Sequence, residues 1–199
     1  MGKIFAALYD PLMKPLELFH MQKIRKKMLQ NVSGRVLEIG SGTGLNFAYY
    51  PEDTEEVQAV EPDGNLRERS LPRSLRSSVP IYVKEGTAEK LPFESNSFDA
   101  VINTLVFCTI QEPEQALKEI IRVARPGGKV LFYEHVRPSH PAAARMSDKL
   151  TPVWKAVCGG CHLNRDTESL IRQSGLEIVR KDNMPGSVFI QLTARVPEK

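Results

Sequence analysis

The residues with the clearest chemical use in this sequence form a glycine-rich segment, Glu38-Ile39-Gly40-Ser41-Gly42-Thr43-Gly44. Glycines directly after a first strand let the backbone turn sharply and approach a ligand closely. The third glycine comes one residue earlier than in the dinucleotide-binding pattern G-x-G-x-x-G. A carboxylate at Glu38 would repel a pyrophosphate but attract a cationic amino or sulfonium group. The segment therefore predicts a site for a positively charged nucleoside cofactor at Glu38, Gly40 and Gly42.

Two further segments fit the same ligand. Glu61 stands in the string Val60-Glu61-Pro62-Asp63, at the end of the second expected strand. A carboxylate about 20 residues after the glycine turn is placed to accept hydrogen bonds from ribose hydroxyls. The string Glu85-Gly86-Thr87-Ala88-Glu89 follows the third expected strand, where backbone groups and a short polar side chain can hold an adenine edge. We assign Asn46 and Pro62 to the same cofactor site.

Two histidines are candidates for catalysis. His135 ends the fifth expected strand, at the edge over which α/β sheets bind ligands. It is the first candidate for a general base or for a cation that stabilises a thiolate. His162, beside Arg165, is the second candidate. A packed or surface role stays open for either histidine, and Cys108 is expected to line the pocket rather than react.

The string Cys158-Gly159-Gly160-Cys161-His162 matches the C-x-x-C-H pattern of c-type haem attachment. Haem attachment needs an exported chain, and the first residues do not resemble an export signal. Zinc would need a second pair of ligands at regular spacing, and a redox dithiol is a further alternative. We favour a helix that ends at the two glycines and carries small, half-buried thiols, and we expect no metal.

The elements that must position these residues alternate between strand and helix. Short β-branched or aromatic runs predict strands over residues 36–39, 57–60, 81–83, 98–102 and 130–136. The clearest helix between them covers residues 114–123, and Arg125-Pro126-Gly127-Gly128 ends it. Strands that alternate with helices predict an α/β fold with a mainly parallel sheet. Helices are expected over 142–156 and 166–173, and strands over 176–181 and 187–195. The link between the last two is too short for a crossover, so they should form an antiparallel hairpin.

The N-terminal region predicts a helix that precedes the sheet. Apolar residues follow one helical face, at Leu12, Leu16, Phe19, Ile24 and Met28. Four basic residues, Lys23, Arg25, Lys26 and Lys27, are expected to form a solvated face opposite them. We expect residues 1–30 to act as a helical flap over the site.

Composition limits the protein class. The chain has 199 residues and a formal net charge of +3, with 41% hydrophobic and 26% charged residues. This length and mixture predict one globular domain, residues 1–199, in which 33–137 bind the cofactor and 138–199 form the substrate side. The small charge gives no reason to expect a nucleic-acid partner. Three cysteines and no long apolar run favour a cytoplasmic location.

Together these motifs resemble the class I S-adenosylmethionine-dependent methyltransferases, over residues 33–137. The resemblance rests on the glycine segment, Glu61, the run from Gly86 to Phe93, and Arg125-Pro126-Gly127-Gly128. It implies a Rossmann-like, seven-stranded, mainly parallel sheet with an antiparallel last strand and helices on both faces. It also implies S-adenosylmethionine as cofactor, with its methionine part near Glu38, Gly40 and Gly42, and its ribose on Glu61. Thr87 and Ala88 are then near adenine, and Asn103 and Thr104 lie under the cofactor.

A narrower resemblance concerns the methyl acceptor. The segments Thr104-Leu105-Val106-Phe107-Cys108, Glu134-His135-Val136 and Cys161-His162-Leu163-Asn164-Arg165 resemble the membrane-anchored mammalian thiol methyltransferases. A small-molecule acceptor, preferably an alkyl thiol, is therefore expected, although the apolar N-terminal anchor of those enzymes is not found here. The alternatives are a quinone precursor or a phospholipid amine, for which residues 23–27 and helix 142–156 could contact a membrane. A non-catalytic cofactor-binding protein or an NAD-dependent enzyme would be further alternatives, and the oligomeric state stays open.

Overall fold

The computed structural model describes residue 11 and residues 21–157, 160–183 and 188–198. Within these residues, seven strands form one sheet in the order β3-β2-β1-β4-β5-β7-β6. The predicted seven-stranded α/β sheet with an antiparallel last strand is therefore confirmed. The chain divides into two compact units: unit 1 comprises Met1–Thr87 with Phe98–Ala100, and unit 2 comprises Ala88–Ser97 with Val101–Lys199. The strand β4 (Phe98–Thr104) contributes residues to both units.

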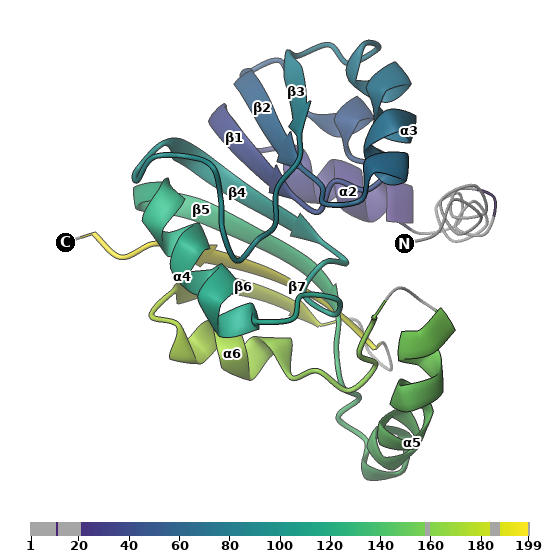
Figure 1. The fold of residues 1–199 in the computed structure, drawn as a ribbon. Coiled ribbons are helices and arrows are strands. Elements are labelled where there is room, and N and C mark those ends of the chain that lie inside the picture. Colours follow the sequence, from purple (N-terminus) through teal and green to yellow (C-terminus); the bar gives the residue numbers. More distant parts are fainter. Residues whose placement is uncertain (1–10, 12–20, 158–159, 184–187, 199) are drawn as a thin grey trace. The chain divides into compact units, whose positions relative to one another are not determined.

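Unit 1 contains three parallel strands (Figure 1): β1 (Gly34–Ile39) pairs with β2 (Thr54–Val60), and β2 pairs with β3 (Ile81–Lys84). Two helices and a 3-10 helix accompany them: α2 (Gln22–Leu29), α3 (Gly64–Ser74) and η2 (Phe47–Tyr49). Val36, Leu37 and Ile39 are buried on both faces of β1, as expected for a parallel strand that reads as a continuous apolar run. The glycine segment begins where β1 ends.

Unit 2 contains the antiparallel part of the sheet. β5 (Ala124–His135) pairs with β7 (Phe189–Arg195), which also pairs with β6 (Glu177–Asn183), and both pairings are antiparallel. The predicted terminal hairpin is thus confirmed. The helices of this unit are α4 (Pro113–Val123), α5 (Pro141–Val157) and α6 (Thr167–Gln173). In α4, the buried side chains of Ala116, Leu117, Ile120 and Val123 recur at helical spacing.

The start of β5 differs from the prediction. It begins at Ala124, six residues before the expected residue 130, and it ends at His135 rather than Val136. Gly127 N donates to Val196 O at 2.9 Å, and Val196 N donates to Gly128 O at 3.0 Å. These bonds extend the ladder beyond the Lys129–Arg195 pair, so the glycines that end α4 also belong to the strand.

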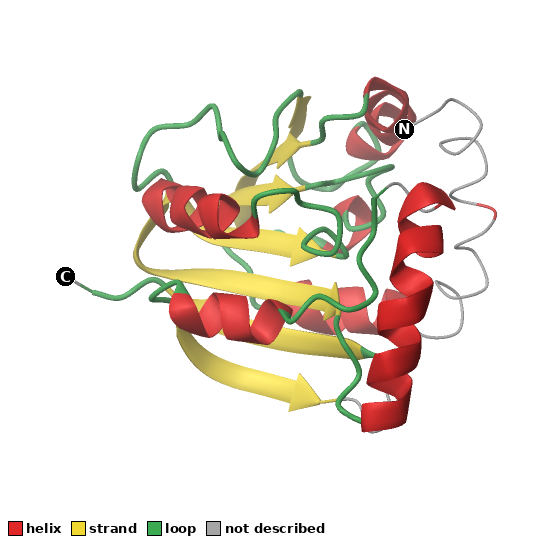
Figure 2. Ribbon diagram, turned by 60° about the horizontal axis from the view of Figure 1, so that its bottom comes forward, coloured by secondary structure: helices red, strands yellow, loops and turns green. Residues whose placement is uncertain are grey.

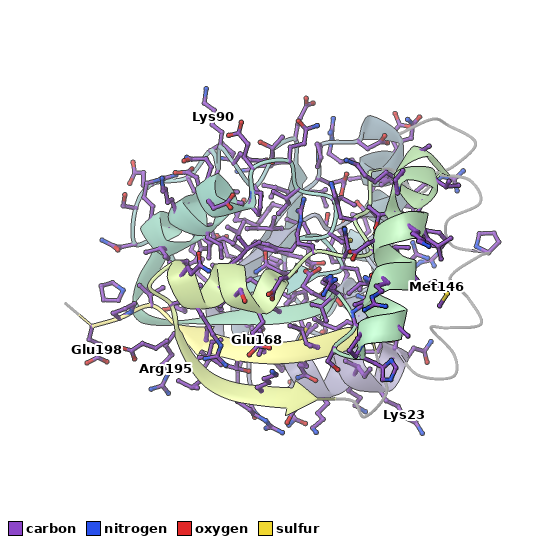
Figure 3. All side chains as sticks on the ribbon, turned by 90° about the horizontal axis from the view of Figure 1, so that it is seen from below. Lys23, Lys90, Met146, Glu168, Arg195 and Glu198 are labelled. Atoms are coloured by element: carbon purple, nitrogen blue, oxygen red, sulfur yellow. The ribbon has the colours of Figure 1, made fainter. Side chains whose placement is uncertain are left out.

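α5 exposes its apolar side chains. Met146, Leu150, Val153 and Trp154, called the apolar stripe below, are 43–68% exposed, whereas the small residues Ala144, Ser147 and Thr151 are buried. Figure 2 shows α5 beside the end of the sheet where β5 terminates, and Figure 3 shows Met146 projecting away from the strands. This distribution reverses the usual one, in which large apolar side chains face the core.

The N-terminal prediction is tested only in part. The expected flap over residues 1–30 falls mostly outside the described residues, which cover α2 but not Leu12, Leu16 or Phe19. Ile24 and Met28 are buried, as predicted. Arg25, which was expected on a solvated face, is only 4% exposed. The prediction was wrong at this position because the Arg25 guanidinium has a buried partner, Asn46.

Candidate active site

Glu61 holds the glycine segment of unit 1 in place. Its Oε2 accepts a hydrogen bond from Gly42 N at 3.0 Å, and its Oε1 accepts one from Asp63 N at 2.9 Å. Asp63 in turn caps α3 by accepting from the backbone N–H groups of Asn65 and Leu66. The Glu61 side chain is buried, and burial raises its pKa while the two N–H donors oppose the rise. Each carboxylate oxygen has a second acceptor position, so Glu61 can still bind hydroxyl groups.

The glycine segment offers room for a ligand. Gly42 has φ +56°, and a Cβ built at this position would meet no heavy atom within 4 Å. Gly40 has φ +61°, in the same left-handed region. In unit 2, Asn103 is fully buried and donates to Leu131 O at 3.4 Å, but its Oδ1 has no partner among the described residues. Within unit 1, the open space above Gly42 fits a bound nucleoside cofactor.

Glu38 lies in a buried network of side chains within unit 1. Its Oε1 accepts from Asn46 Nδ2 at 3.0 Å, and its Oε2 accepts from Tyr50 Oη at 2.6 Å. Asn46 Oδ1 accepts from Arg25 Nη1 at 2.7 Å, so the amide links the guanidinium to the carboxyl group. Burial raises the pKa of Glu38 to about 7, although the Tyr50 hydroxyl and the Arg25 charge favour the carboxylate. The protein thus supplies a positive charge of its own near the acid for which we expected a cationic ligand.

The other predicted cofactor residues differ in exposure. Pro62 and Thr87 are exposed in unit 1, whereas Ala88 is buried and Thr104 is half-buried in unit 2. Thr104 ends β4 and Thr87 follows β3, so both stand at the carboxyl ends of strands, where α/β sheets bind ligands. Their contact with the cofactor remains a proposal.

His135 is the last residue of β5 and is half-buried in unit 2. Its ring packs edge-on against Phe189, with 5.5 Å between the ring centroids, and its Nδ1 has no hydrogen-bond partner among the described residues. Burial lowers the pKa of His135, so the neutral imidazole dominates at neutral pH. Of its two predicted roles, a neutral ring suits the general base and disfavours the stabilising cation.

His162 has a different set of neighbours in unit 2. Its backbone N donates to Cys108 O at 2.8 Å, and its ring Nδ1 lies 3.1 Å from the same oxygen. Arg165 Nη2 lies 3.3 Å from that ring nitrogen. One side of the imidazole is therefore occupied by the protein, and burial lowers the pKa of the ring. Because protein groups already contact its ring Nδ1, His162 fits a structural role better than a catalytic one.

Glu134 is a site residue that sequence reasoning did not single out by itself. It is fully buried next to His135, and its two oxygens accept hydrogen bonds of 3.1 Å from the backbone N–H groups of Val106 and Phe107. Arg165 Nη1 donates to Phe107 O and, at 2.6 Å, to Ile110 O. The three segments that carried the narrower resemblance, around residues 104–108, 134–136 and 161–165, therefore contact one another.

Cys161 completes this cluster. It is half-buried, and interactions with Cys108, Trp154 and Arg165 lower its pKa, whereas the interaction with Cys161 and burial raise the pKa of Cys108. Both thiols are free, and Cys158 lies outside the described residues. In the described parts of the chain, no three histidine, cysteine or acidic side chains gather as metal ligands would. Nor does any described helix combine the length and apolar character needed to span a membrane.

Comparison with known proteins places the chain in a family. A family model described as a methyltransferase domain matches residues 37–132. The thiol S-methyltransferase TMT1B of Mus musculus is 34% identical over 177 residues, which cover 86% of this chain and 71% of the relative. The chain belongs to the class I S-adenosylmethionine-dependent methyltransferases. It uses S-adenosylmethionine as its cofactor and methylates a small molecule.

Two other similar proteins show how broad this group is. The ubiquinone/menaquinone biosynthesis C-methyltransferase UbiE of Ectopseudomonas mendocina is 32% identical over 213 residues, which cover 92% of this methyltransferase and 82% of the relative. A crystal structure of a SAM-dependent methyltransferase from Thermotoga maritima superposes with a TM-score of 0.69 at 24% identity, covering 97% of this chain and 98% of the other. The last match supports the fold alone.

Proposed function

We propose that this methyltransferase transfers the methyl group to the sulfur of a small thiol. The observation that carries the proposal is the cluster in unit 2 of the three segments around Cys108, Glu134 and Cys161, together with 34% identity to a thiol S-methyltransferase. The described residues of unit 2 also provide no carboxylate that orients His135, whose Nδ1 is unpaired. A thiol suits such a site because it is partly ionised near neutral pH and needs little help from a base.

Different residues of the chain would bind the cofactor and take the proton of the acceptor. In unit 1, Glu61 and the glycine segment would hold the ribose and the methionine part. When bound, S-adenosylmethionine supplies a methyl group on a positively charged sulfur, so the protein mainly aligns the acceptor with it. His135, neutral because of its burial, would take the proton of an acceptor that arrives as the thiol. With the acceptor deprotonated and aligned by these residues, its sulfur would take the methyl group, and the sulfur of the cofactor would be the leaving group.

A pH–rate profile of His135→Asn tests this proposal, with an alkyl thiol and a phenol assayed side by side for S-adenosylhomocysteine release. With the thiol, we expect the loss of rate mostly below the thiol pKa of about 8.5, shrinking as the pH rises. A hydroxyl acceptor should instead lose about 10²–10⁴-fold, because it depends on the base. His140→Asn, at an exposed position, is the matched control. Turnover of the phenol but not the thiol would overturn the proposed acceptor and leave methyl transfer intact.

A second candidate acceptor is a quinone precursor, favoured by the 32% identity to UbiE. Including such a compound in the same assay separates the two candidates. Turnover with any acceptor also excludes the non-catalytic alternative. The cytoplasmic location inferred from the cysteine content stays a proposal.

The apolar stripe of α5 supports a proposal of contact with an anionic lipid surface. Arg145, Lys149 and Lys155 are exposed on the same helix, and its acidic residue, Asp148, is ion-paired with Arg137 at 2.8 Å. An apolar face beside cations is typical of helices that lie in a membrane interface. Co-sedimentation with phosphatidylserine vesicles should fall for Leu150→Glu but not for Gln173→Glu, which adds the same charge on α6. Equal binding by both variants would contradict the contact.

A further inference from the structure

The segment Leu105–Ile110 directly follows the carboxyl end of β4 in unit 2, and it has little regular structure of its own. Leu105, its first residue, has φ +57°, and its N–H donates to Tyr133 O at 2.8 Å. Inside the segment, Thr109 N and Ile110 N both donate to Val106 O, at 2.9 and 3.3 Å. A left-handed leucine is unusual, and the surrounding structure must hold it in that conformation.

Two side chains, one an acid and the other a base, hold the segment: one accepts from its backbone N–H groups and the other donates to its backbone carbonyl groups. The Glu134 carboxyl accepts from the N–H groups of Val106 and Phe107, both at 3.1 Å. The Arg165 guanidinium donates to the carbonyl groups of Phe107 and Ile110. Glu134 comes from β5 and Arg165 from the loop before α6, so residues distant in sequence meet at one short segment.

The Glu134 carboxyl group is buried at a cost in free energy. Glu134 is 0% exposed, and removing such a group from water costs free energy unless donors replace the water. Two backbone donors could have been satisfied by a turn or a strand without any charge. The groups that face Glu134 are the charge of Arg165 and the thiols of Cys161 and Cys108. The arrangement is therefore a clamp on one loop, made by an acid and a base, rather than ordinary core packing.

We infer that Glu134 and Arg165 are positioning residues that hold segment 105–110 in the shape that receives the methyl acceptor. This inference rests on the proposed function and extends it. The segment leaves the sheet at the carboxyl end of β4, and His135, the proposed base, directly follows Glu134 in sequence. Ligands of α/β sheets bind over this end of the strands. Because the clamp acts on the loop, its loss should affect the acceptor and spare the cofactor.

The test compares Glu134→Gln with wild type and with Glu119→Gln. Glutamine keeps the size of the side chain but can accept only one of the two backbone N–H bonds through its single carbonyl oxygen. Glu119 is the matched control in the same unit, because its Oε2 accepts from a backbone N–H, Leu91, at 2.9 Å in a different loop. At about pH 9, where the Glu134 carboxyl is ionised, we expect Glu134→Gln to raise the acceptor KM about tenfold and to leave the affinity for S-adenosylhomocysteine within about twofold. Glu119→Gln should leave the acceptor KM unchanged.

A pH series separates positioning from a merely structural role. Burial raises the pKa of Glu134 to about 8, and the carboxylate is the better acceptor for both N–H groups. With an aromatic thiol that is ionised throughout, the wild-type acceptor KM should fall as the pH rises from about 7 to 9. The Glu134→Gln profile should be flat in this range. A wild-type profile without this change would overturn the inference, as would parallel losses of acceptor and cofactor affinity.

Amide hydrogen exchange keeps the inference testable if Glu134→Gln folds poorly or if thiols are not the acceptor. Arg165→Lys retains the charge but loses the planar guanidinium, whose Nη1 donates to two carbonyl groups while its Nη2 lies 3.3 Å from His162 Nδ1, and it should raise the acceptor KM in the same direction. In wild type, the amide protons of Val106 and Phe107 should be protected, and Glu134→Gln should reduce protection there but not at Leu91. If only a phenol is turned over, the thiol proposal fails, and the clamp is then judged by the phenol KM. Unchanged exchange at Val106 and Phe107 would overturn the clamp whatever the acceptor.

Discussion

Glu38 in unit 1 and Glu134 in unit 2 are both buried carboxyl groups near the end of a strand, yet different donors hold them. Glu38 accepts from two side chains, Asn46 and Tyr50, and Arg25 adds a positive charge through Asn46. Glu134 accepts from two backbone N–H groups of one loop. Burial raises both pKa values, to about 7 and about 8. Side-chain donors can rotate to new partners when the acid is lost, whereas backbone donors stay where the chain puts them.

The largest expected effect follows from that difference. Glu134→Ala leaves two buried N–H groups without an acceptor, at about 1–3 kcal/mol each, so the free energy of unfolding should fall by about 2–6 kcal/mol. Glu38→Ala should cost less, because Asn46 and Tyr50 can reorient. Urea denaturation of both variants gives the comparison. An equal loss in the two variants would show that the kind of donor does not matter here.

Stability should also depend on pH through the same two groups. Their raised pKa values mean that the folded chain binds protons more tightly than the unfolded chain, which titrates near the ordinary value of 4.5. The stability from the neutral carboxyls is complete below pH 4.5 and is lost as the pH rises through about 7 and 8. We expect a decrease of several kcal/mol between about pH 5 and 8, with the larger part from Glu134, whose pKa is raised further. Glu38→Gln and Glu134→Gln should each flatten part of this curve; a curve that rises with pH in wild type would contradict the assignment.

Glu61 is a third buried carboxyl group, and unlike Glu134 it is proposed to bind the cofactor directly. Glu61→Ala should remove charge-assisted hydrogen bonds worth about 1.5–3 kcal/mol and weaken S-adenosylhomocysteine binding by roughly ten- to a hundredfold. Calorimetry measures this directly. Unchanged affinity in Glu61→Ala, or tighter binding of NAD than of S-adenosylhomocysteine, would remove Glu61 from the cofactor site.

The smallest effect is expected for Tyr50→Phe. It deletes the 2.6 Å hydrogen bond to Glu38 Oε2 but leaves the donor from Asn46 in place. The unfolding free energy should fall by about 1–1.5 kcal/mol, because the lost bond is replaced in part by rearrangement of neighbours. The pKa of Glu38 should rise further, since the hydroxyl favours the carboxylate. A stability loss as large as that of Glu134→Ala would count against a difference between the two acids.

Much of unit 1 was predictable from sequence, because its signals are local. The glycine segment follows a buried apolar strand, and Glu61 bonds to Gly42 N as a residue at the end of the second strand should. Arg25 shows the limit: it belongs to a basic run whose three lysines, Lys23, Lys26 and Lys27, are exposed, and its partner lies 21 residues away at Asn46. The spacing of apolar and polar residues along the sequence does not indicate a hydrogen bond between two such distant side chains.

The clamp in unit 2 was not predictable for a related reason. Glu134 was noted only as part of a strand end, because hydrogen bonds to backbone N–H groups impose no requirement on the side chains of Val106 and Phe107. The early start of β5 escaped prediction as well, because its first bonds run to Val196, near the far end of the chain. The segments were recognisable, but their mutual contacts depend on the complete fold.

The left-handed conformation of Leu105 has a consequence for which sequences this fold tolerates. At φ +57°, glycine is free of the strain that a side chain brings, and asparagine suffers less of it than β-branched residues do. In a library randomised at position 105 and sorted only for folding, glycine and asparagine should be enriched and valine and isoleucine depleted. The preceding β4 positions, such as Val101 and Ile102, should show the opposite preference, so the boundary between strand and loop would appear as an abrupt reversal in the accepted residues.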